Sequence, residues 1–289
     1  MNKGNCRNRW LAEQRFSVSH LNYSVPKLTD MTYILGAKCS DGVVLVADTK
    51  VTIGEGTEHS YSKKIFKPFT QVYMGAAGMG GLYKSFENRV VSVVNTYNQL
   101  QDKDPKYQLN SSQSFSVLVE NVIREMHSVY GDDRNLILQQ FDALMAQRIT
   151  NDAELSHITP IGFMEPIDTI KVIGHGEPYG AFFLKKKIWR PDFTMQDTAK
   201  LAIFIINHIQ NQKLDNSVGF DEEYLPQVCY VPNIPKDIQI DESTSQKFSI
   251  KEAEQREVNA MLGEIKELDK PVTTLVEDFN SFFRKNFLK

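Results

Sequence analysis

A threonine, an aspartate, a lysine and a glycine follow one another at suggestive intervals early in the chain. Asp48 comes sixteen positions after Thr32, Lys64 sixteen after Asp48, and Gly78 fourteen after Lys64. A threonine hydroxyl is a weak nucleophile that needs an adjacent base. If Thr32 is the first residue of the working chain, its own α-amino group, with an ordinary pKa of about 7.7–8.0, accepts the hydroxyl proton. With such a free amine, Thr32 would be able to carry out acyl transfer.

The other three residues fit further requirements of this chemistry. An ammonium at Lys64 lowers the pKa of a neighbouring amine and keeps it neutral, provided that Asp48 holds the lysine in place. The backbone N–H of Gly78 stabilises the oxyanion, an effect worth about 2.7–4 kcal/mol per donor in a well-studied hydrolase. Each residue type is common by itself, so the joint spacing carries the prediction. The mechanism requires that the peptide bond before Thr32 is absent.

Short strands and a glycine-rich turn must position these residues. Residues 32–39 and 43–47 predict paired strands, because both are short and apolar and the tripeptide SDG between them favours a hairpin. The uninterrupted run 43–47 is typical of a strand covered on both faces. A second apolar stretch, KIFKPFTQVYMGAAG, then leads into the turn at Gly78.

The later elements alternate between helices and strands. Apolar residues at helical spacing predict helices over residues 81–101, 111–131 and 194–212. Residues 141–147 predict a strand, and residues 222–234 predict a closing strand. The first two helices are expected to run antiparallel over a sheet.

The spacing resembles that of proteasome β subunits and of the related HslV-type peptidases, both N-terminal-nucleophile hydrolases. The matching motifs are ADTKVT, KKI and the AG turn that contain Asp48, Lys64 and Gly78. This resemblance implies an α+β fold, a four-layer αββα sandwich with two antiparallel sheets face to face. It also implies a threonine endopeptidase without a cofactor, acting on protein or peptide substrates. Such subunits form homo- or hetero-oligomeric rings with other proteasome-type subunits, and an ATPase unfoldase or an α-type ring restricts entry.

The same resemblance assigns substrate contacts. Val51 and Ala76 would flank the pocket for the residue before the scissile bond, and a small lining would favour apolar or bulky side chains. The backbone at Thr52 and Gly80 would align the substrate as an added strand.

The second half of the chain departs from the family pattern. His175 stands where the family has the first Ser of a GSGS turn, and it either relays a proton near neutral pH or is a turn histidine that faces water or crowds the site. Asp215 and Ser217 correspond to a DxxSGG brace of the threonine, but they lie one residue closer together than in that motif. Either Asp215 reaches the site through a shifted turn, or the brace is lost.

Three segments are expected: an N-terminal extension (1–31), a proteasome-type domain (32–235) and a C-terminal helical tail (236–289). The extension is either a propeptide removed by self-cleavage or a mis-assigned upstream stretch, and an organellar transit peptide is a third interpretation. We favour the second, because Met31 takes the place of the Gly that usually precedes the threonine in such precursors, and removal of Met31 as an initiator would expose Thr32. The aromatic residues of the tail, Phe279, Phe282 and Phe283, are expected to pack on the domain or on a ring neighbour.

Charge and cysteine usage exclude other classes of protein. With 33 basic and 36 acidic residues, the chain has neither a nucleic-acid footprint nor a membrane-binding patch. No apolar run approaches the roughly 18–20 residues that span a bilayer. Cys6, Cys39 and Cys229 lack metal-ligand spacing, and the location expected is a reducing cytoplasm. Two rivals remain: a structural ring subunit with Thr32 blocked, and another amidohydrolase of the same fold acting on a small amide.

Overall fold

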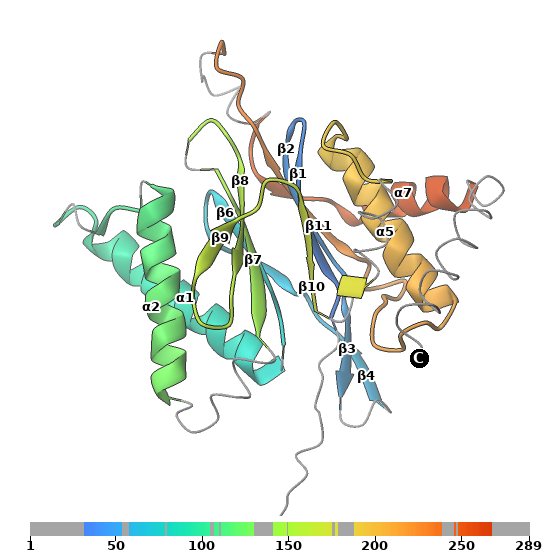
Figure 1. The fold of residues 1–289 in the computed structure, drawn as a ribbon, viewed down its shortest axis with the longest axis horizontal. Coiled ribbons are helices and arrows are strands. Elements are labelled where there is room, and N and C mark those ends of the chain that lie inside the picture. Colours follow the sequence, from blue (N-terminus) through green and yellow to red (C-terminus); the bar gives the residue numbers. More distant parts are fainter. Residues whose placement is uncertain are drawn as a thin grey trace, which may run out of the picture.

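Two antiparallel sheets of five strands each form the centre of the described chain (Figure 1). This computed structural model describes residues 32–53, 58–78, 80–104, 107–109, 111–129, 141–148, 150–174, 177–178, 188–238, 246 and 248–267. The first sheet has the order β10 (Ile170–Ile173), β1 (Ile34–Cys39), β2 (Gly42–Ala47), β11 (Gln227–Pro232) and β12 (Lys251–Glu252). The second has the order β5 (Ile65–Phe69), β6 (Val72–Ala77), β7 (Asp142–Gln147), β8 (Glu154–Ile158) and β9 (Met164–Pro166). A separate hairpin joins β3 (Lys50–Ile53) to β4 (Glu58–Tyr61).

Helices cover the outer face of each sheet. Figure 1 shows α1 (Gly80–Leu100) and α2 (Ser112–Val129) beside the second sheet, and α5 (Met195–Asn211) and α7 (Gln255–Glu267) beside the first. One apolar cluster lies under each helical pair. A third cluster, which includes Ile34, Leu45 and Leu144, joins the two sheets. The sheets approach closely at Gly36, where an added Cβ would lie 2.9 Å from the Leu155 side chain.

The local sequence explains the elements around the site. The hairpin predicted between β1 and β2 is present, with Cys39 opposite Gly42, and β2 is buried on both faces as its continuous apolar run indicates. Helix α5 begins at a capping box, in which Thr194 and Asp197 each bond the backbone N–H of the other. Cys39 and Cys229 are buried free thiols.

The stretch expected as a helical tail contributes a strand as well as a helix. The closing strand predicted within residues 222–234 is present as β11, which lies between β2 and β12 in the first sheet. Helix α7 then packs against α5 through apolar residues such as Val258 and Met261. The aromatic part of the tail and the N-terminal extension (1–31) lie outside the described residues.

Helices that could cross a membrane were sought among the described residues, and none is long and apolar enough. Those residues also contain no group of three or more His, Cys, Asp or Glu side chains placed to hold a metal ion.

Candidate active site

A buried ion pair lies where β2 ends. Asp48 is fully buried, and its Oδ1 atom accepts a hydrogen bond of 2.7 Å from Nζ of Lys64. The same ammonium donates to the carbonyl oxygen of Lys50 at 2.6 Å. Backbone N–H groups of Tyr33 and Gly219 donate to the two carboxylate oxygens at 2.8 and 3.2 Å. The carboxylate is thereby tied to the peptide group that directly follows Thr32.

Opposing effects act on the ionisation of this pair. Burial raises the pKa of Asp48, whereas the Lys64 ammonium and the N–H groups of Tyr33 and Gly219 lower it. All these partners are donors, which an ionised carboxylate accepts fully and a protonated one does not. The ion pair is therefore the state that the hydrogen bonds favour.

A glutamine of the first sheet fixes the backbone of the lysine, which directly precedes β5 of the second sheet. Oε1 of Gln227 accepts hydrogen bonds from the backbone N–H of Lys64 at 2.6 Å and of Ile65 at 2.9 Å. Its Nε2 donates to the carbonyl oxygen of Ile65 at 3.1 Å and to Oε1 of Glu252, in β12, at 3.4 Å. Gln227 thus holds the main chain of Lys64 while Asp48 holds its ammonium, and β12 supports the glutamine.

Two glycines adopt backbone conformations that other residues rarely take. Gly78 follows β6 with a φ of 134°, and Gly174 follows β10 with a φ of 80°. A Cβ atom added to Gly174 would lie 2.2 Å from the carbonyl oxygen of Thr32. Close packing against Gly174 therefore holds Thr32, of which 5% is exposed.

Replacing Gly174 by alanine is expected to lower the free energy of unfolding by at least about 2 kcal/mol, because both the conformation and the contact with Thr32 are lost. Urea denaturation measures the change. The matched control is Gly263→Ala in α7, where an added Cβ meets nothing within 4 Å. That control should raise the stability by about 0.5–1 kcal/mol. Equal effects of the two substitutions would contradict the packing role of Gly174.

A cavity of about 270 Å³ opens beside Thr32. Six residues predicted from the sequence line it: Thr32, Val51, Thr52, Lys64, Ala76 and Gly78. Lys63, Tyr83 and Lys84 line it as well, and none of these three was predicted. Gly80, the other predicted substrate contact, begins helix α1. Three of the four residues singled out by their spacing, Thr32, Lys64 and Gly78, thus line one cavity. The fourth, Asp48, forms the ion pair with Lys64.

The predicted brace bonds within its own turn. The hydroxyl and the backbone N–H of Ser217 both donate to Oδ1 of Asp215. The turn reaches the ion pair through the backbone N–H of Gly219, which donates to Oδ2 of Asp48. The carbonyl oxygen of Gly219 accepts from the backbone N–H groups of Thr49 and Lys50 at 3.1 and 3.0 Å. His175 lies outside the described residues, so both interpretations of it stay open.

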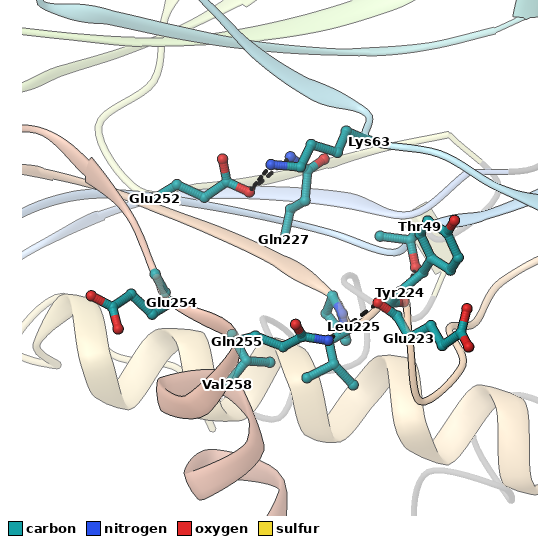
Figure 2. A pocket seen from close by; sticks show the side chains of 12 residues that line it. Thr49, Lys63, Glu223, Tyr224, Leu225, Gln227, Glu252, Glu254, Gln255 and Val258 are labelled. Atoms are coloured by element: carbon teal, nitrogen blue, oxygen red, sulfur yellow. Dashed lines mark hydrogen bonds and ion pairs between the residues drawn. The ribbon is translucent and has the colours of Figure 1, made fainter.

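A second cavity, of about 400 Å³, has Lys63 in its lining together with Glu252 and Gln227 (Figure 2). Lys63 lines both cavities, and its ammonium bonds Oε1 of Glu252 at 2.8 Å. Figure 2 shows this pair above Gln227, while Glu223 and Glu254 lie farther along the lining. The charge of Lys63 is thus directed away from the cavity that contains Thr32.

Sequence reasoning missed the residues that position the site from a distance. Gln227 is 163 positions from Lys64, and no spacing motif connects them. Gly174 and Gly219 were not among the predicted site residues, although they lie next to His175 and two positions after Ser217. Tyr83 and Lys84 could have been found, because they lie three and four positions after Gly80 and so share its face of the helix.

The fold and this site define a protein of the N-terminal-nucleophile hydrolase type. A family model described as "Proteasome subunit" matches residues 31–223. A proteasome subunit beta of Ferroglobus placidus is 25% identical over 209 residues, which cover 72% of this chain and 92% of the relative. One from Methanosphaera stadtmanae is 26% identical over 172 residues, 60% of this chain and 75% of the relative.

Solved structures show the same fold at lower identity. The ancestral β-subunit Anbu from Yersinia bercovieri superposes with a TM-score of 0.62 at 14% identity, covering 84% of this chain and 95% of that one. Anbu from a Hyphomicrobium species gives a TM-score of 0.56 at 17% identity, covering 84% and 97%. The chain belongs to the proteasome subunit family.

Proposed function

We propose that this protein is a threonine endopeptidase of the proteasome β type, with Thr32 as its N-terminal nucleophile. The observation that supports it most is the placement of Thr32 and Lys64 in one cavity, with Asp48 bonded both to the lysine and to the peptide N–H after Thr32. A solvated lysine or a turn-capping aspartate would not need this buried pair.

In the proposed reaction, Oγ of Thr32 attacks the carbonyl carbon of a peptide bond and passes its proton to the α-amino group of the same residue. The positive charge of Lys64 keeps that amine neutral before the attack. The N–H of Gly78 stabilises the oxyanion of the tetrahedral intermediate. When the intermediate collapses, the departing amine takes the proton and Thr32 remains acylated as an ester. Water then attacks the ester and restores the hydroxyl.

Substrate and assembly follow from the same proposal. Val51 and Ala76 form the pocket for the side chain before the scissile bond, and the backbone of Thr52 and Gly80 pairs with the substrate strand. Assembly into a ring with proteasome-type subunits, and entry controlled by an ATPase unfoldase, are part of the proposal. Three apolar clusters, one under each helical pair and one between the sheets, support the four-layer αββα arrangement.

A peptide epoxyketone tests the proposal, because its ring product needs a free amine next to the hydroxyl. Protein produced from Met31, with the methionine removed, should gain the mass of one inhibitor per chain and cleave fluorogenic peptides. Protein that retains residues 1–31 should do neither. If the form with a bare Thr32 is neither labelled nor active, the proposed function is wrong.

The two rival functions predict different results for intact mass, inhibitor labelling and size exclusion. A structural ring subunit would keep residues 1–31 attached in its native assembly, which intact mass measures directly. Another amidohydrolase would be labelled but would run as a small oligomer in size exclusion and would not cleave peptides.

A further inference from the structure

Among the residues that the structure describes, the lining of the cavity beside Thr32 contains three lysines and no acidic residue. Lys63, Lys64 and Lys84 contribute to it, together with the apolar or aromatic side chains of Val51, Ala76 and Tyr83. A substrate side chain that enters therefore meets apolar walls and positive charge. Which of the three ammonium groups is available to the substrate depends on the partners of each.

Two of the lysines already form ion pairs with carboxylates that do not line this cavity. The ammonium of Lys64 is 2.7 Å from the buried carboxylate of Asp48, so turning it towards a substrate would leave a buried charge unpaired. The ammonium of Lys63 is directed to Glu252, in the second cavity (Figure 2). Both lysines add positive potential to the cavity, but their ammonium groups are paired with Glu252 and Asp48.

The ion pair of Lys84 is far weaker than the buried pair of Lys64, and Lys84, unlike Lys63, does not line the second cavity. Its ammonium pairs with Oε2 of Glu87, three positions along α1, at 2.7 Å, and 63% of the Lys84 side chain is exposed. An exposed pair at this helical spacing contributes little free energy, so a substrate carboxylate can replace Glu87 at small cost. Lys84 is therefore the lysine best placed to bind a negative charge in the cavity.

Tyr83 gives the cavity a rigid wall next to Lys84. Its hydroxyl donates to the carbonyl oxygen of Lys63 at 3.2 Å. Burial, then the neighbouring Glu87, raise the pKa of Tyr83, so the phenol stays neutral and adds no negative charge to the cavity. Val51 and Ala76, together with the ring of Tyr83, suit a methylene stem.

We propose that this cavity selects an acidic side chain, glutamate above all, before the scissile bond and rejects lysine and arginine there, with Lys84 as the specificity-determining residue. The inference rests on the proposed function, in which this cavity receives the side chain that precedes the cleaved bond. It departs from the sequence-based expectation of an apolar or bulky preference, because that expectation did not include Lys84.

Fluorogenic tripeptides that end in Glu, Leu or Arg test the selectivity in the form of the protein that begins at Thr32. We expect kcat/KM to be about tenfold or more higher for Glu than for Arg, since one close charge contact of either sign is worth about that factor. Lys84→Glu should invert the order, and Lys84→Met should reduce the preference for Glu without creating one for Arg. The control is Lys103→Glu, the same charge change just beyond the far end of α1, which should leave the order unchanged.

A binding measurement separates this inference from the proposed function. The full chain carrying Thr32→Ala is titrated by calorimetry with acetylated tripeptide acids that end in Glu, Leu or Arg. Tighter binding of the Glu peptide that is lost in Thr32→Ala/Lys84→Glu supports the selectivity even if no form cleaves peptides. Cleavage with no difference between Glu and Arg, or an order that Lys84→Glu leaves unchanged, overturns the selectivity while the peptidase stands. Absence of any difference among the three peptides in binding overturns it as well.

Discussion

Replacing Lys64 by methionine is expected to abolish peptidase activity and to lower the free energy of unfolding by about 3–5 kcal/mol, the usual cost of removing one partner of a buried ion pair. Asp48 is fully buried and would lose its ammonium donor, while the carbonyl oxygen of Lys50 would lose its hydrogen bond. Urea denaturation and hydrolysis of a fluorogenic peptide measure the two losses.

The adjacent lysine provides a matched control. Lys63→Met removes an ion pair in which 69% of the lysine side chain is exposed, so it should cost about 1 kcal/mol or less. The double variant Asp48→Asn/Lys64→Met should be more stable than Lys64→Met alone, because no buried charge is left. If Lys63→Met and Lys64→Met cost the same, the ion pair does not stabilise the fold as we describe.

The stability of the Lys64→Met variant is expected to fall as the pH rises. Burial raises the pKa of Asp48, and in the variant the ammonium no longer opposes it. A carboxyl group whose pKa is higher in the folded state binds more protons there than in the unfolded chain, so stability decreases with pH from about 3.9, the ordinary pKa, up through the folded pKa. Denaturation midpoints at pH 5 and pH 8 test this. A midpoint that is higher at pH 8 would contradict it.

Much of the site could be predicted because its main residues lie in consecutive short strands. The strand-hairpin-strand pattern places Thr32 and Asp48 at the same end of β1 and β2, as the register of Ile34 with Ala47 shows. Lys64 then precedes β5, from where its side chain reaches Asp48. Motif spacing could identify these residues without any knowledge of tertiary contacts.

The positioning residues could not be predicted, because their partners are distant in the chain. Gln227 satisfies backbone donors of another sheet, and nothing in the local pattern of β11 indicates which groups it faces. Strand β12 has two residues, too few to show a period, although its Glu252 bonds both Gln227 and Lys63. The turn after α5 is one residue shorter than the family motif, and its contact with Asp48 is made by Gly219.

Substituting Thr32 by alanine is expected to reduce peptide hydrolysis at least about 10³-fold, because the hydroxyl that forms the ester is removed while the pocket remains. Thr32→Ser keeps the hydroxyl and the amine and should retain measurable activity. Both variants should fold like the parent, since the contact with Gly174 is made by the carbonyl oxygen of residue 32 and not by its side chain.

The free amine makes a separate contribution that this series can isolate. A chain with an intact Thr32 hydroxyl but with Met31 retained has no α-amino base, and general base catalysis is typically worth about 10²–10⁴-fold. We therefore expect the Met31 form to be nearly as inactive as Thr32→Ala and to resist the epoxyketone, although its hydroxyl and the Asp48–Lys64 pair are unchanged. Intact mass establishes which N-terminus each sample carries before rates are compared. Full activity with Met31 in place would mean that Lys64 or another group accepts the proton of the Thr32 hydroxyl. Thr32 would then not need a free α-amino group for catalysis.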